Sequence, residues 1–236
     1  MSERETPFWR RPIWLLGHVI ALTAVVLFVR LGFWQLDRLD EKRARNDVIA
    51  ARTDGPPVDV VDVDPGVAEY QHVTAAGTFD GAGEVVVRYQ SLQGSVGRHV
   101  VTPLVLSDGR AVLVNRGWIP DHLDVPPPPA GEVAVEGTLL ESRTSGPRNP
   151  DDGVLTVLNR LDVARVQQQS DRELVPLWLS QTAPSPDDDF PIRLPPPARD
   201  EGPHLSYAGQ WFLFAGVVGV GYPLLLRRRR HTVDDV

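Results

Sequence analysis

Histidine is the residue type in this chain that is best suited to hold a metal-bearing group. The sequence contains six histidines, no cysteine, and Met1 as its one methionine, so thiolate and thioether sites of the kind used by soft-ligand copper carriers are excluded. His18 and His204 lie within or beside apolar runs, where an ionisable side chain is by default a functional hypothesis. Ordinary polar roles are favoured for the others, which are His72, His99, His122 and His231.

More polar and aromatic residues lie near His204 in the sequence than near His18. It opens the stretch HLSYAGQWFLFAGVVGVGYPLLLRRRR, which contains Tyr207, Gln210 and Trp211 within its first turns. Trp34 and Gln35 lie at the far end of the other apolar run. Tyr207 and Trp211 are equally typical of an interfacial aromatic belt. His18 is expected roughly 20 Å from His204 in depth by helix rise, so the two cannot bind one metal ion.

The segments that must position these residues are two expected membrane helices. Leu205 to Leu226 carry no formal charge and would make about 33 Å of helix, close to a hydrocarbon core of roughly 30 Å. Arg227–Arg230 follow directly, and arginines also precede the apolar run Ile13–Val29. Basic clusters stay on the cytoplasmic side, which predicts that both termini are inside. The alternative interpretation of the first apolar run is a cleaved signal peptide. The run is long for a signal peptide, however, and no A-x-A cleavage site follows it.

The expected organisation places one domain between these helices, outside the cytoplasm. The divisions are a cytoplasmic N-terminus at 1–12, a membrane helix at 13–34, a helical stalk at 35–55, an extracytoplasmic β-rich domain at 56–183, a proline-rich tether at 184–204, a membrane helix at 205–226 and a basic cytoplasmic tail at 227–236. The fold class is thus a membrane protein with two transmembrane α-helices enclosing a mostly antiparallel β domain.

Alternation of apolar residues predicts the strands of that domain. The segments VTAAGTF, EVVVRYQ, RHVVTPLVL, RAVLVNRGWI, EVAVEGTLL and GVLTVLNRL are expected strands, and LVPLWLSQ is a further candidate. Asp108-Gly109 predicts a hairpin. Residues 161–171 are the one expected helix, and Pro126–Pro129 are an expected stiff connector. We expect a compact sheet or open barrel.

Charge and motifs exclude several classes of protein. The net charge is −7, and an acidic middle between basic ends lacks the clustered basic face that nucleic acid needs. The segment GVVGVG at 216–221 is as rich in glycine as a phosphate-binding loop. Because it lies within an expected apolar helix, its small residues are better explained by close packing of helices. No strong catalytic constellation is present, so we expect no enzymatic activity.

Three separated blocks resemble the surfeit locus protein 1 family of cytochrome c oxidase assembly factors, as found in bacteria. They are LGFWQLDRLDEKRAR at 31–45, TPLVLSDGRAVLVNRGWIP at 102–120 and HLSYAGQWFLFA at 204–215, in the family's order and spacing. The family pattern reads G-x-W-Q-x-x-R, V-N-R-G-W and N-H-x-x-Y-A-x-x-W. This chain has Pro203 where the family commonly has asparagine, which puts the local geometry before His204 in doubt.

The resemblance implies a multi-pass protein of the plasma membrane that assists insertion of haem a into the catalytic subunit of an aa3-type oxidase. It implies transient haem a contact through His204 as the iron ligand, with a surrounding set of Trp34, Gln35, Tyr207, Gln210 and Trp211. The implied partners are that catalytic subunit, membrane lipids and a respiratory supercomplex. The alternative is a structural accessory subunit that stays bound to the oxidase or supercomplex without touching haem.

Overall fold

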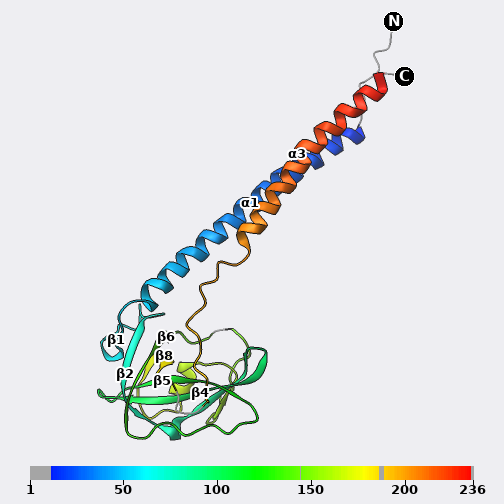
Figure 1. The fold of residues 1–236 in the computed structure, drawn as a ribbon. Helices are drawn as coiled ribbons and strands as arrows, with labels where there is room; N and C mark the ends of the chain where they lie inside the picture. Colours follow the sequence, from blue (N-terminus) through cyan, green and yellow to red (C-terminus); the bar gives the residue numbers. More distant parts are fainter. Residues whose placement is uncertain (1–11, 144, 186–188, 235–236) are drawn as a thin grey trace. The chain divides into compact units, whose positions relative to one another are not determined.

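The computed structural model describes residues 12–143, 145–185 and 189–234, and the side chains up to residue 228. The expected cytoplasmic N-terminus therefore lies, except for Pro12, outside the described residues, and so does the very end of the tail. The chain forms two compact units, a helical one and a β-rich one that spans Val48–Ala198. Figure 1 shows the elements of each unit.

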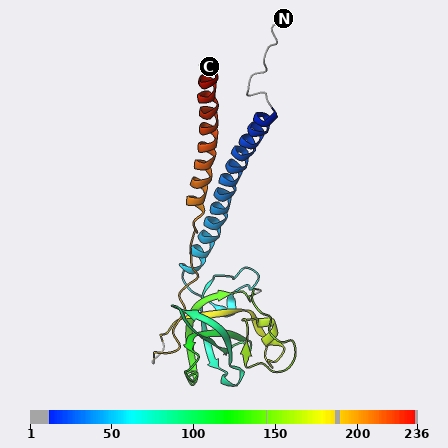
Figure 2. The same ribbon diagram turned by 90° about the vertical axis from the view of Figure 1, so that its right-hand side faces the viewer.

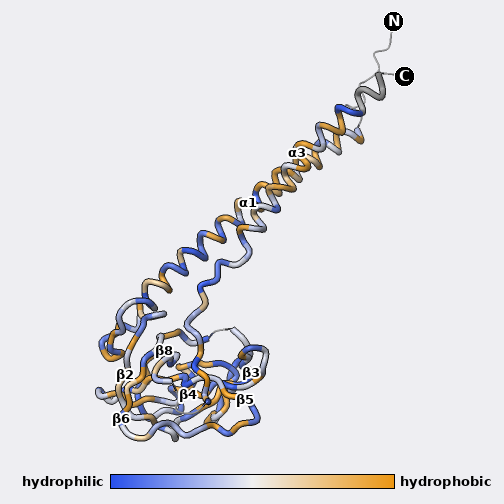
Figure 3. Tube along the Cα trace, in the orientation of Figure 1, coloured by the Kyte–Doolittle hydropathy of each residue, from blue (hydrophilic) through white to orange (hydrophobic). Residues whose placement is uncertain are grey.

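The helical unit consists of two long helices that run antiparallel and side by side (Figures 1 and 2). Helix α1 covers Pro12–Thr53 and helix α3 covers His204–Asp234. Both are long and apolar enough to cross a membrane, and Figure 3 shows apolar residues along much of each. Helix α1 runs without a break through the expected membrane helix at 13–34 and on to Thr53, just short of the expected end of the stalk at residue 55. Pro223 lies inside α3.

The β-rich unit is built on a closed five-stranded barrel, where an open barrel or a sheet was expected. The barrel strands are β2 (His72–Phe79), β4 (Ser95–Leu106), β5 (Ala111–Pro120), β6 (Glu132–Leu140) and β8 (Leu174–Ala183), in the order β2-β6-β8-β5-β4. Pairing of β2 with β4 closes the circle. Gly77 permits this, because a Cβ there would meet the Val105 carbonyl oxygen at 2.0 Å.

The sheet is mostly antiparallel, as expected, with one parallel pair in the barrel wall, β5 with β8. Outside the barrel, β3 (Val85–Leu92) extends the sheet from β4, and the two-residue strands β1 (Val58–Asp59) and β7 (Val157–Leu158) pair with its edges. The turns η2 (Val60–Asp62) and η3 (Gly81–Gly83) are 3-10 helices. The predicted hairpin at Asp108-Gly109 is confirmed, with Gly109 at φ +87° between β4 and β5.

Two sequence predictions in this unit are wrong in extent. GVLTVLNRL forms a strand only at Val157–Leu158, because side chains rather than a neighbouring strand hold its backbone: Gln169 accepts from Leu155 N–H, and Asn149 accepts from Asn159 N–H at 2.7 Å. The helix expected at 161–171 is the short α2 (Val163–Gln167), begun by Asp162, whose carboxylate accepts from Arg165 N–H. LVPLWLSQ does form a strand, β8.

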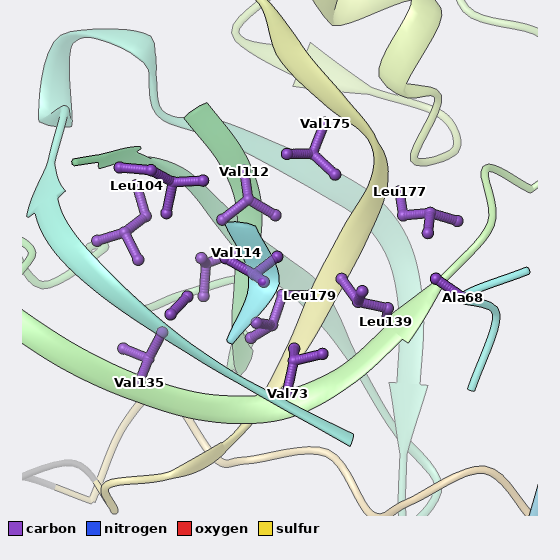
Figure 4. Packing of buried hydrophobic residues seen from close by; sticks show 13 residues of the cluster. Ala68, Val73, Leu104, Val112, Val114, Val135, Leu139, Val175, Leu177 and Leu179 are labelled. Carbon is purple, nitrogen blue, oxygen red and sulfur yellow. The ribbon is translucent and has the colours of Figure 1, made fainter. Parts of the chain in front are cut away.

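Two apolar clusters hold the unit together, one on each side of β5. Val112 and Val114 point into the barrel, where Figure 4 shows them packed with residues of every other barrel strand, among them Val73, Leu104, Val135 and Leu179. The alternate residues Ala111 and Leu113 join a second cluster that includes Leu158, Val163 and Trp178. Since successive side chains of a strand face opposite sides, β5 is buried on both faces.

The last turn of α1 belongs to the β-rich unit. Ile49 is 1% exposed, and Arg52 donates to the Glu69 carbonyl oxygen at 2.7 Å. Shortly after the helix, the Gly55 carbonyl oxygen accepts from His72 Nδ1 at 3.1 Å. The barrel unit therefore begins within the helix, before the prolines at 56 and 57.

Candidate functional site

The candidate site lies where α1 and α3 pack against each other in the helical unit. On α1 the inward-facing residues include Phe28, Gly32, Gln35 and Leu39, and on α3 they include His204, Ala208, Trp211 and Ala215. In both helices these positions recur at alternating steps of three and four residues. That spacing places them on one stripe of an α-helix, so the two stripes form a continuous seam.

A hydrogen bond between Gln35 and His204 marks one end of the seam. His204 Nδ1 lies 2.8 Å from Gln35 Oε1. A carbonyl oxygen can only accept, so Nδ1 carries the proton and donates. In the neutral imidazole the lone pair then lies on Nε2, the nitrogen that can bind a metal. Gln35 is 9% exposed, so its amide is held in place by the surrounding helices.

Gly202 lies beside the edge of the His204 ring that carries Nε2. Gly202 has φ +71°, and a Cβ at that position would lie 3.4 Å from both Nε2 and Cδ2 of His204. Any side chain there would start against the ligand edge of the ring. Pro203 takes part in starting the helix, since its carbonyl oxygen accepts from Ser206 Oγ at 2.8 Å and from Tyr207 N–H at 3.1 Å. The residue that departs from the family pattern thus supports the first turn through its backbone.

Aromatic rings fill the seam next to the polar pair. Phe28 stacks on Trp211 with ring centroids 5.6 Å apart and an interplanar angle of 25°. Phe33 meets Phe212 edge to face at 5.4 Å. Gly32 lets the helices come together here, because a Cβ on it would lie 2.6 Å from the ring of Phe212. These contacts fix the depth at which Gln35 faces His204.

The structure brings some of the predicted site residues together and separates others. Gln35 and His204 are in direct contact, and Trp211 lies in the seam. Trp34 and Tyr207 are 48% and 47% exposed, Gln210 is also exposed, and the Arg38 guanidinium lies 5.8 Å from the Trp34 ring. Trp34, Tyr207 and Gln210 therefore do not enclose His204 within this chain; they present their side chains outward from the same helical turns.

His18 has a separate partner near the other end of the seam. Its Nδ1 lies 2.8 Å from the Tyr222 hydroxyl, and the two rings meet edge to face at 5.5 Å. Gly17 makes room for that hydroxyl, which would lie 2.9 Å from a Cβ at position 17. Sequence reasoning missed this pair and Phe28 as a partner of Trp211. Counting back from Gln35 in alternating steps of three and four residues reaches Gly32, Phe28 and His18. This spacing places all three on the side of α1 that faces α3, and it could have predicted both contacts.

Within the described residues, no group of three or more His, Asp or Glu side chains could hold a metal ion. A site at His204 offers a single imidazole nitrogen. This suits a metal whose other ligands come with it, as in a porphyrin, rather than a bare divalent ion, which needs several protein ligands.

The chain is similar to a known protein family over most of its length. Residues 22–216 match the model of the SURF1 family. This matched range includes the seam from Phe28 to Trp211. An uncharacterized SURF1-like protein of Mycobacterium tuberculosis is 27% identical over 232 residues, with 91% of this chain and 84% of that protein covered. SURF1-like proteins of Monosiga brevicollis and Rickettsia conorii are 26% and 24% identical, covering 88% and 93% of this chain and 86% and 94% of theirs. With the family model matching most of its length, the chain belongs to the SURF1 family.

Proposed function

We propose that this protein is an assembly factor, not an enzyme, that assists insertion of haem a into the catalytic subunit of an aa3-type cytochrome c oxidase. The observation that carries the proposal is the hydrogen bond from His204 Nδ1 to Gln35. It selects the imidazole tautomer whose Nε2 can bind iron, at the end of two helices that are apolar enough to cross a membrane. Membership of the SURF1 family supports the same reading.

The residues present fit a haem held in passing. His204 would supply the one protein ligand through Nε2, on the ring edge beside Gly202, a residue that places no side chain there. Haem a, when bound, would supply the iron and the apolar macrocycle. The outward-facing Trp34 and Tyr207 offer aromatic surface on neighbouring turns, and a second protein must cover the other side of such a ligand. A half-buried site with a single protein ligand suits transfer better than storage.

The proposed setting is the plasma membrane, with both termini in the cytoplasm and the barrel outside. The arginine cluster after α3 and the arginines before α1 favour this orientation. Lipid then surrounds the exposed apolar side chains of both helices, including Ile20, Leu22, Leu213 and Val217, which are otherwise unaccounted for at the surface. The proposed partners are the catalytic subunit of the oxidase and, through it, a respiratory supercomplex.

The test is the absorption spectrum of the purified full-length protein, from cells that make haem a and from cells that do not. A Soret band present only in the first sample supports the proposal. His204→Ala should remove or shift that band and lower the haem a content of the oxidase, while the amount of this protein in the membrane stays normal. Gln35→Leu should weaken the band, because Nδ1 loses the acceptor that fixes the tautomer.

His122→Ala is the matched control, since His122 is exposed and lies in a loop of the barrel unit. It should leave both the spectrum and the oxidase unchanged. Normal spectra and normal oxidase in the His204→Ala strain would refute the haem proposal. Stoichiometric co-purification with fully haemylated oxidase in that same strain would favour the structural accessory subunit instead.

A further inference from the structure

A cavity of about 360 Å³ lies in the barrel unit, between the two proline-rich stretches of the chain. The expected stiff connector after β5 supplies Pro126, Pro127 and Pro129, and the segment after β8 supplies Pro184, Phe190 and Pro191. Phe79, Val133 and Ala134 complete the apolar walls. The polar groups in this cavity are Arg116, Arg193, Gln181 and Ser185.

Arg116 is fully engaged by the protein. It is 5% exposed, and its guanidinium forms an ion pair with Glu84 at 3.0 Å. It also donates to the carbonyl oxygens of Pro126 and Pro127, each at 3.0 Å. Arg116 therefore holds the proline connector against the barrel, and its charge is balanced by Glu84.

Arg193 carries a positive charge that no carboxylate of the described residues balances at salt-bridge distance. Its Nε donates to the Pro184 carbonyl oxygen at 3.0 Å and its Nη1 to the carbonyl oxygen of Arg116, which leaves Nη2 to face other partners. Burial, and then the neighbouring charge of Arg116, lower the pKa of Arg193 to about 10. The group stays protonated at neutral pH in surroundings that oppose its charge, and a bound anion would relieve that opposition.

Gln181 also lines this cavity. The residue is 3% exposed, its Nε2 donates to the Ala183 carbonyl oxygen at 3.2 Å, and its Oε1 is buried without a hydrogen-bond partner among the described residues. Buried polar atoms in native proteins are rarely left unpaired. Because this oxygen is buried, the Gln181 side chain must rotate toward the cavity before a bound molecule can donate to it.

We propose that this cavity binds an organic monocarboxylate with an apolar body, with the carboxylate on Arg193 and the apolar part between the proline-rich walls. Among the described residues, Arg193 is the one charged group of this cavity without a carboxylate partner, which matches a monoanion, and the proline and phenylalanine side chains match an aliphatic group. The last residue of a polypeptide and a free short-chain acid both have this chemistry. Only the polypeptide also carries an amide N–H next to its carboxylate, which could donate to Gln181 Oε1 once that side chain rotates toward the cavity. The proposal is independent of haem binding at His204.

The experiment measures binding of small acids to the full-length protein in lipid nanodiscs by ligand-detected NMR. N-acetyl-leucine should bind, whereas N-acetyl-leucinamide, which lacks the carboxylate, and inorganic phosphate, which lacks the apolar body, should not. If 3-methylbutanoate binds about as well as N-acetyl-leucine, free acids are the source. If N-acetyl-leucine binds at least about tenfold tighter, the polypeptide terminus is the source.

Two independent variants test the position of the site. Arg193→Gln should weaken binding by about 10- to 100-fold, the usual effect of losing a charge-assisted hydrogen bond. Ala134→Phe should abolish binding by filling the cavity while leaving Arg193 in place. Arg172→Gln, which removes an exposed arginine that lines a different cavity, is the matched control and should bind as the wild type does.

Thermal unfolding of each variant checks that the barrel is intact. The proposal is overturned if the wild type binds neither acid or binds the amide as tightly as the acid. It is also overturned if folded Arg193→Gln and Ala134→Phe proteins both retain wild-type affinity.

Discussion

His99 should make the barrel less stable at mildly acidic pH. The Asn115 amide is oriented by Gly117, whose N–H donates to Asn115 Oδ1 at 3.0 Å, so Asn115 Nδ2 faces His99 Nδ1 at 3.3 Å and donates to it. Protonating Nδ1 would place two donors face to face. Burial, and then the charge of Arg143, lower the pKa of His99 from 6.5 to about 4.

The sign and size of the effect follow from that difference. Between about pH 6.5 and about pH 4 the unfolded chain binds a proton at His99 and the folded chain does not, so stability falls as the pH falls through this window. It is unaffected above the window and levels off below it. One pKa unit corresponds to about 1.4 kcal/mol, which gives a loss of about 2 kcal/mol at pH 5 and about 3 kcal/mol once the folded form is half protonated.

The assay is chemical denaturation of the full-length protein at a series of pH values, followed by a barrel-specific signal. Because other histidines titrate in the same range, the quantity to compare is the difference between wild type and His99→Gln. That difference should shift by about 2 kcal/mol between pH 7.5 and pH 5, in favour of the variant at low pH. Arg143→Gln should narrow the window only slightly, because burial is the larger cause. A wild-type-minus-variant difference that stays constant with pH would refute the reasoning.

Three further predictions concern the rest of the chain. Ile49→Ala should lower the barrel's free energy of unfolding by about 2–5 kcal/mol in denaturant titrations, because the side chain is fully buried; an unchanged midpoint would mean that the barrel does not need the end of α1. A membrane-impermeant thiol reagent should label Val154→Cys, at an 80% exposed position, but not Thr232→Cys in intact cells, and the reverse pattern would contradict the proposed orientation. Gly32→Leu should lower the thermal midpoint in detergent, and adding Phe212→Ala should restore it; a double variant no better than the single one would show that the close approach to this ring is not the cause.

The local features of the barrel could be predicted from the sequence, and its closure could not. Alternation identified seven of the eight strands that the structure describes, all but β1, and Asp108-Gly109 identified the hairpin between two of them. Closure depends on β2 pairing with β4 at Gly77, and the parallel pair joins β5 to β8 across more than fifty residues. Both pairings join strands that are far apart in the sequence, so no local sequence pattern predicts them. The strand predicted at 153–161 is confined to Val157–Leu158 because Asn149 and Gln169 bind the backbone on either side of it with their side chains.

The candidate site was predictable in its centre and not in its surroundings. An ionisable residue at the boundary of an apolar helix singled out His204, and the family blocks placed Gln35 beside it. Depth along a helix says nothing about direction around it, so Trp34 and Tyr207 were grouped with residues that face the other way. The side of the helix that a residue faces follows from the spacing of three and four residues between inward positions. Because these positions hold both small and aromatic residues, hydropathy alone gives only a weak signal for them.

The two polar pairs of the seam, Gln35 with His204 and His18 with Tyr222, fix the length of the apolar stretch between them as well as the register of the two helices. From His18 to Gln35 along α1 is ~26 Å of helix, and from His204 to Tyr222 along α3 is ~27 Å, slightly less than a typical hydrocarbon core of ~30 Å. In a bilayer much thicker than this, each pair would be drawn into hydrocarbon; in a much thinner one, the apolar stretch between them would meet water. The helices would then tilt or the lipid would thin to compensate, which couples the pairing of α1 and α3 to hydrophobic mismatch. In a membrane, the acyl-chain length of the lipids would therefore influence whether Gln35 and His204 stay in contact.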